Sequence, residues 1–133
     1  MAVGPHPRPL SPHLSIWKWQ PNMAVSIFHR VSGHALAVAG IIIFAWWLVA
    51  AASGAEAYDG FRAIFGHWLG TLVLVGVTWA FFQHLFSGLR HFWMDAGHGY
   101  ELGTAQRSSI AVFALALAAT AAVWAVFLLR PGI

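Results

Sequence analysis

Three long stretches of apolar, almost uncharged sequence constrain the fold of this chain most strongly. They cover about residues 24–53, 61–92 and 108–129, and each is long enough to supply the ~20 residues that a helix needs to cross a bilayer. Only 8% of the 133 residues are charged and 59% are hydrophobic, whereas ~25% of a soluble domain is charged. We therefore expect an all-α membrane protein with a three-helix transmembrane domain, residues 24–130, preceded by a cytoplasmic or interfacial segment, residues 1–23.

The N-terminal segment is rich in proline and ends in Trp17, Lys18 and Trp19. Tryptophan beside lysine is typical of the lipid headgroup layer, where an indole ring is buried while its N–H stays hydrated. The segment lacks the apolar run of a signal peptide and the Arg-rich, amphipathic character of a mitochondrial presequence. The expected location is the inner membrane of a bacterium, and a mitochondrial inner membrane is less favoured.

Basic residues near the ends of the spans predict the orientation in the membrane. Five of them flank one side of the predicted bundle and two flank the other: Arg8, Lys18, Arg30, Arg90 and Arg107 against Arg62 and Arg130. The excess places the N-terminus in the cytoplasm and the C-terminus outside. No basic run or RNA-type motif accompanies these charges, so no nucleic-acid partner is expected.

The chain has 8 histidines and no cysteine. The absence of cysteine excludes disulfides, thiolate-held iron–sulfur clusters and a covalently attached c-type haem. Any redox centre held by this chain must therefore rest on histidine.

Ser26, Arg30 and His34 follow one another at four-residue spacing near the start of the first span, so they share one helix face. A hydroxyl and a guanidinium are donors that suit a quinone carbonyl. An isolated arginine at this depth is equally compatible with a side chain that reaches the lipid headgroups. The added hydroxyl and imidazole favour the binding site.

His84 lies six residues before Arg90, which places it about 9 Å deeper in the membrane at 1.5 Å per residue. An imidazole at that depth needs a hydrogen-bond partner or a metal. His84, Gly88 and His91 share a face, and a glycine there would let a flat macrocycle approach. A b-type haem often takes two axial imidazoles, and the second is then either His34 or a histidine from a partner chain.

The sequence predicts less specific roles for the remaining histidines and for Arg30 beside them. His29, Arg30 and His91 lie nearer the membrane surface than His84 and suit haem propionates. His67 lies at the opposite end of the bundle and is expected to be structural or interfacial. Solvated loop positions are expected for the others, which are His6, His13 and His98.

Three motifs in order along the chain closely resemble the cytochrome b subunit of succinate dehydrogenase, the larger membrane anchor of respiratory complex II. They are Arg8-Pro-Leu-Ser-Pro-His-Leu14, Ser26-Ile-Phe-His-Arg-Val-Ser-Gly33, and His84-x-x-x-Gly-Leu-Arg-His-Phe-x-Met-Asp-x-Gly97. The resemblance covers nearly the whole chain.

This resemblance implies a heterotetramer of a flavoprotein that oxidises succinate, an iron–sulfur protein and two three-helix anchors that share one haem b and a ubiquinone site. It makes His84 an axial ligand of the haem iron, with the second supplied by the sister anchor. Ser26 and Arg30 match the residues of the quinone site. His29, Arg30 and His91 match the group around the haem propionates. The chain would not act on succinate itself but would contribute to quinone reduction.

Two residues stay open in this reading. Asp95 belongs to the third motif, and we expect it to pair with Arg90 or His91. His34 is not required by the family motif, so we expect it to be packed or hydrogen-bonded.

Other functions are compatible with parts of the pattern. An anchor of a fumarate reductase would have a similar sequence, and a structural tether without haem would use its histidines only to hydrogen-bond partner helices. A transporter or proton-conducting subunit needs polar groups across the whole membrane, whereas the third span has none beyond Thr120. The apolar spans are expected to contact lipid. Small residues such as Gly66, Gly70 and Gly76 suggest close contact with partner helices as well.

Overall fold

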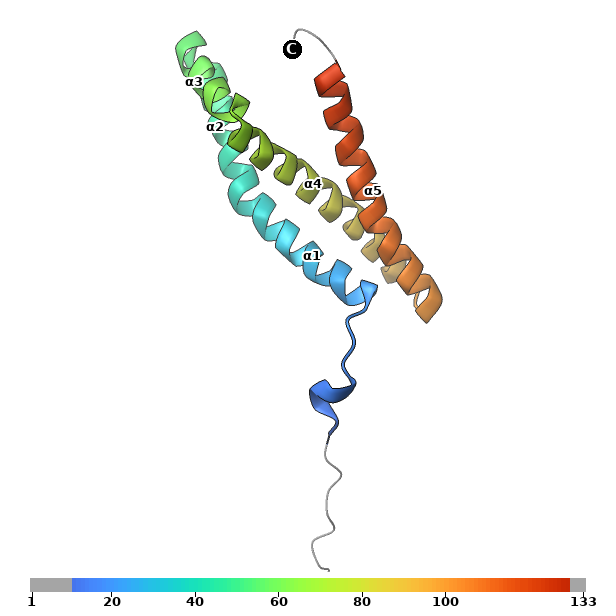
Figure 1. Ribbon diagram of the computed structural model, residues 1–133. Coiled ribbons are helices and arrows are strands. Elements are labelled where there is room, and N and C mark those ends of the chain that lie inside the picture. The colour runs from blue at the N-terminus through green and yellow to red at the C-terminus, as the bar shows by residue number, and fades with distance from the viewer. Residues whose placement is uncertain (1–10, 130–133) are drawn as a thin grey trace, which may run out of the picture.

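The structure is a computed structural model that describes residues 11–129, and it contains helices and no strand within that range (Figure 1). Its 3 membrane-length rods are Pro21–Ser53, Trp68–Asp95 and Leu102–Leu129. The expected all-α, three-span membrane fold is confirmed. Arg8 and Arg130 of the orientation argument, His6 and the first residues of the first motif lie outside the described residues.

The first rod consists of three consecutive elements, α1 (Pro21–Ala35), a π-helical segment η2 (Leu36–Gly40) and α2 (Ile41–Ser53). A short 3₁₀ helix, η1 (His13–Ile16), precedes it. The rod starts at Pro21 rather than near residue 24, because the fixed φ of proline suits the first helical turn. It ends at Ser53 and is followed by Gly54, whose φ of +110° is accessible to glycine but strained for other residues.

The region expected to form a continuous second span from residue 61 is divided into α3 (Ala55–Gly66) and α4 (Trp68–Asp95). His67 separates them, because its backbone is extended, with a ψ of 149°. The His67 ring accepts a hydrogen bond from the backbone N–H of Leu69 at 3.4 Å, so it caps α4. Phe61 is buried in α3 and packs edge-on against Trp46 of α2. The charges near this end therefore lie on a separate helix that packs on α2.

The third rod is the single helix α5 (Leu102–Leu129), which starts before the expected residue 108. It packs along α4 and lies closest to it near the end of the bundle where α1 begins (Figure 1). At that end Gln106 of α5 donates a hydrogen bond to Gln20, the residue before α1, at 3.2 Å. The start of α1, the end of α4 and the start of α5 therefore meet at one end of the bundle.

The seam between these three helices is built from small and polar side chains. Its largest fully buried side chains are Val25, Ser32, Gln83, Ser87 and Ser109. Most of the large apolar side chains point outward, as expected where lipid or partner helices replace water. Small side chains let the helix backbones approach each other, so neighbouring helices can exchange polar contacts.

Three further contacts fix how the helices are rotated about their axes. Phe28 of α1 packs edge-on against Trp79 of α4 and Phe113 of α5, with ring centroids 5.7 and 5.5 Å away. Nearer the other end, Trp124 of α5 donates a hydrogen bond to Thr78 of α4 at 3.4 Å. These contacts orient the polar face of α4 toward α1.

The junction between α3 and α4 generates a prediction about stability. A Cβ at Gly70 would lie 2.6 Å from Cα of Phe65, and backbone cannot give way as a flexible side chain can. Gly70→Ala is expected to cost about 1–3 kcal/mol of stability and to lower the melting temperature of the detergent-purified protein by several degrees. Helical circular dichroism on heating measures this. Gly66→Ala is the control, because a Cβ there meets nothing within 4 Å; equal melting of the two variants would contradict the prediction.

Candidate functional site

Three histidines from two helices form a continuous column of imidazole rings. His84 of α4 stacks on His29 of α1, with centroids 4.1 Å apart and an interplanar angle of 8°. His91, two turns further along α4, meets His29 edge-on at 4.7 Å and 62°. All three side chains are half-buried. The structure thus brings together three of the histidines that the sequence singled out, at the end of the bundle where α1 begins.

The hydrogen bonds of His84 determine which ring nitrogen is free. Its Nδ1 lies 3.1 Å from the backbone carbonyl oxygen of His29. A carbonyl can only accept, so Nδ1 of His84 must carry the proton and donate. In a neutral imidazole the lone pair then lies on Nε2. Ser32 joins this contact, because its Oγ lies 3.4 Å from the same Nδ1 and donates to the same carbonyl at 3.0 Å.

A hollow of about 310 Å³ opens beside His84 between α1 and α4. Its lining is His29, Arg30, Gly33, His34, Ala37 and His84. The Arg30 side chain is exposed there, so a strong cationic donor is available to a ligand. His34 is also exposed, and its Nδ1 is bonded to the carbonyl of Arg30 at 2.8 Å. The expected hydrogen bond of His34 is therefore made to its own helix.

Ser26 lies one turn nearer the start of α1 than Arg30 and is half-buried. It does not line the hollow beside His84. The three-residue stripe of the sequence therefore divides, with Arg30 and His34 at the hollow and Ser26 beyond its edge. A ligand that contacts both Ser26 and Arg30 would lie nearer the start of α1 than His84 does.

Two glycines have different roles at the histidine column. A Cβ at Gly88 would lie 3.9 Å from Cε1 of His29, which is ordinary van der Waals contact. At Gly33 it would lie 2.9 Å from Cε1 and 3.3 Å from Nδ1 of His84, which is too close. Gly33, which the sequence reasoning quoted without a role, is therefore the glycine that admits the His84 ring. Gly33 follows His29 by four residues, so the two lie on the same face of the helix. This spacing was the signal in the sequence that could have revealed its role.

Arg90 does not form the expected pair with Asp95. Its side chain is 9% exposed and turned to α5, where Nε donates to Oγ of Ser108 at 3.0 Å and Nη2 to the carbonyl of Ala105 at 3.4 Å. Asp95 is exposed. The Ser108 hydroxyl and the Ala105 carbonyl, in the first two turns of α5, are acceptors that the sequence pattern alone did not place near Arg90.

Several buried polar atoms have no hydrogen-bond partner among residues 11–129. They are Nδ1 of His29, Nε1 of Trp79, both side-chain amide atoms of Gln83 and Oγ of Ser87. The first belongs to the imidazole column and is available to a further group there. Gln83 and Ser87 lie one turn apart on the inner face of α4, and the sequence reasoning gave neither a role.

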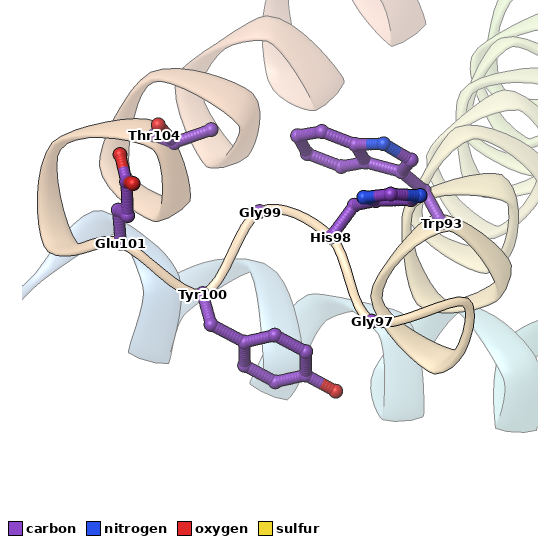
Figure 2. A pocket seen from close by; sticks show the side chains of 7 residues that line it. All are labelled: Trp93, Gly97, His98, Gly99, Tyr100, Glu101 and Thr104. Carbon is purple, nitrogen blue, oxygen red and sulfur yellow. The ribbon is translucent and has the colours of Figure 1, made fainter.

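A second hollow, of about 470 Å³, lies at the loop between α4 and α5 (Figure 2). His98 was expected in a solvated loop, and it is exposed, but its ring stacks on Trp93 at 6.5 Å and 26°. Gly99 has a φ of +78°, and a Cβ there would meet the Trp93 ring. His13 is exposed in η1. This loop hollow shares no lining residue with the hollow beside His84. The described residues contain no cluster of three or more His, Asp or Glu side chains that could hold a metal ion.

Comparison with known proteins places this arrangement in a family. The succinate dehydrogenase/fumarate reductase transmembrane subunit family matches residues 4–123. The succinate dehydrogenase cytochrome b556 subunit of Paracoccus denitrificans is 45% identical over 107 residues, which cover 80% of this chain and 82% of that protein. The cytochrome b556 subunit of Rickettsia felis is 36% identical, over 88% of this chain and 90% of the relative. The cytochrome b560 subunit of Reclinomonas americana is 30% identical, over 90% and 86%. The chain therefore belongs to the succinate dehydrogenase/fumarate reductase transmembrane subunit family, among its cytochrome b subunits.

Proposed function

We propose that this chain is the anchor of a succinate:quinone oxidoreductase in which His84 is an axial ligand of haem b and Ser26 and Arg30 bind ubiquinone. The observation that carries the proposal is the hydrogen bond from Nδ1 of His84 to the His29 carbonyl at 3.1 Å. It leaves Nε2 as the free lone pair of a ring that borders an open hollow. Metal-bound histidines are commonly held by such a bond from the other ring nitrogen.

The residues around His84 fit a haem in three respects. The Nδ1 hydrogen bond orients the His84 ring, Gly33 leaves room beside it, and the hollow between α1 and α4 is open. His29, Arg30 and His91 supply donors toward the membrane surface, where propionates would lie. A bound haem b would supply one-electron redox chemistry, while this chain would hold and orient it. The second axial imidazole would come from a sister anchor.

Arg30 and Ser26 are the groups of this chain that suit a quinone. The guanidinium donates charge-assisted hydrogen bonds to a carbonyl oxygen, and these strengthen as negative charge develops on that oxygen during reduction. The serine hydroxyl adds a neutral donor one helical turn away. Reduction of ubiquinone to its quinol takes two electrons, delivered by the iron–sulfur subunit, and two protons, for which water and the nearby imidazoles are donors.

The assembly follows from the same proposal. The exposed apolar side chains of all three rods would contact lipid and the sister anchor, and the flavoprotein and iron–sulfur subunits would dock at the cytoplasmic end, where α1 begins. The bacterial inner membrane is the proposed location. Curated relatives named for succinate dehydrogenase favour succinate oxidation over fumarate reduction as the physiological direction.

The first test removes the proposed ligand. His84→Ala should abolish the haem b bands in the reduced-minus-oxidised spectrum of the purified complex, because the proposal makes Nε2 of His84 the single bond from this chain to the haem iron. His34→Ala is the matched control from the same hollow and should keep the bands. A normal spectrum for His84→Ala would refute the ligand role, and loss of the bands in His34→Ala would make His34 the second ligand.

The second test concerns the quinone. Arg30→Ala should lower succinate:ubiquinone reductase activity by about 10- to 100-fold, since a hydrogen bond to a charged group contributes ~1.5–3 kcal/mol. Ser26→Ala should lower it only severalfold. Succinate oxidation by an artificial acceptor that bypasses the membrane site should be unaffected. Arg62→Ala, which removes an arginine from α3 at the other end, is the control. Equal quinone activity of Arg30→Ala and Arg62→Ala would contradict the proposal.

A further inference from the structure

Ser32 is a buried hydroxyl placed at the contact between α1 and the proposed ligand. Its side chain is 1% exposed, and its Oγ donates to the carbonyl oxygen of His29 at 3.0 Å. That oxygen also accepts from Nδ1 of His84 at 3.1 Å, and Oγ lies 3.4 Å from this Nδ1. The hydroxyl, the carbonyl and the imidazole N–H therefore form a closed triangle of polar contacts. A serine hydroxyl needs only one carbonyl on its own helix to be satisfied, so its contact with His84 is additional.

Gly33, the next residue, restricts the same ring by shape. Its missing side chain leaves a space that Cε1 of His84 fills, and a Cβ there would lie 2.9 Å away. The neighbouring ring face of His84 is covered by His29 at a centroid distance of 4.1 Å. The imidazole is thus enclosed by backbone at one edge and by another imidazole at one face. Rotation of the ring would break the bond to the His29 carbonyl.

We propose that Ser32 and Gly33 are positioning residues for the haem ligand, with Gly33 fixing the orientation of the His84 ring and the Ser32 hydroxyl setting the strength of its Nδ1 hydrogen bond. This inference rests on the proposed ligand role of His84. Ser32 competes with His84 for the lone pairs of a single carbonyl. Removal of the hydroxyl leaves His84 as the only side chain that donates to this carbonyl, so the N–H bond strengthens and the imidazole becomes more basic. A more basic ligand stabilises ferric over ferrous haem.

The role of the Ser32 hydroxyl is tested by redox titration of haem b in the purified complex. Ser32→Ala should lower the midpoint potential, and Ser32→Thr, which keeps a hydroxyl able to bond the same carbonyl, should restore it toward the wild-type value. A change confined to packing would not follow the presence of the hydroxyl. An unchanged or raised potential in Ser32→Ala overturns the role of the hydroxyl.

The role of Gly33 is tested by measuring how fast the complex releases its haem. Gly33→Ala should release haem b to excess apomyoglobin about 10-fold faster than wild type, the size typical for loss of a group that orients a metal ligand. Gly76→Ala is the control on α4, because a Cβ there meets nothing within 4 Å, and its release rate should match wild type. Release from Gly33→Ala at the wild-type rate overturns the role of this glycine.

Failure of this inference and failure of the proposed function give different results. If His84→Ala keeps its haem b, the proposed function is wrong and the positioning role falls with it. If His84→Ala loses haem b while the Ser32 and Gly33 variants keep the wild-type potential and release rate, His84 is the ligand and only the positioning role is wrong.

Discussion

The close approach of α1 to α4 is the constraint on which the rest of the structure depends. In a bilayer, apolar side chains gain little by leaving lipid for a protein interior, so helices associate through small residues, tight packing and polar contacts. Here Ser32 and Gly33 of α1 meet α4 at His84 with no large side chain between them. The backbone carbonyl of His29 can therefore accept a hydrogen bond from a side chain of the neighbouring helix. A bulkier seam would separate that carbonyl from the imidazole.

The same end of the bundle gathers the polar groups that a membrane protein otherwise avoids. Gln83 and Ser87 are completely buried on α4, and Arg90 is held by the first turns of α5. Arg90 is satisfied by the Ser108 hydroxyl and the Ala105 carbonyl, which both lie in the first two turns of α5. The middle and far end of the spans hold few polar side chains, among them Thr71, Thr78 and Thr120. Conduction across the membrane would need polar groups throughout the spans.

The split between α3 and α4 illustrates where sequence reasoning met its limit. Residues 61–92 form one apolar stretch in the sequence, and hydropathy cannot reveal that the backbone of a single residue is extended and interrupts the helix. The break at His67 depends on a ring nitrogen that caps α4 and on a glycine, Gly70, that fits against the end of α3. Likewise, the expected partner of Arg90 was the nearest acid in sequence, Asp95. The observed acceptors lie on α5, and only the packing of two helices brings them within reach.

The sequence by itself determined that the chain is a three-span helical membrane protein, because apolar length and scarcity of charge leave no other solvent for it. It also determined which histidines share an end of the bundle, since the helical rise fixes their depth. Only the tertiary structure decided that His84 stacks on His29, donates through Nδ1 and fits against Gly33. Rotation of one helix about its axis leaves depth unchanged but moves every side chain to another neighbour. Helix rotation is set by the packing of all three helices together, and no single stretch of sequence encodes it.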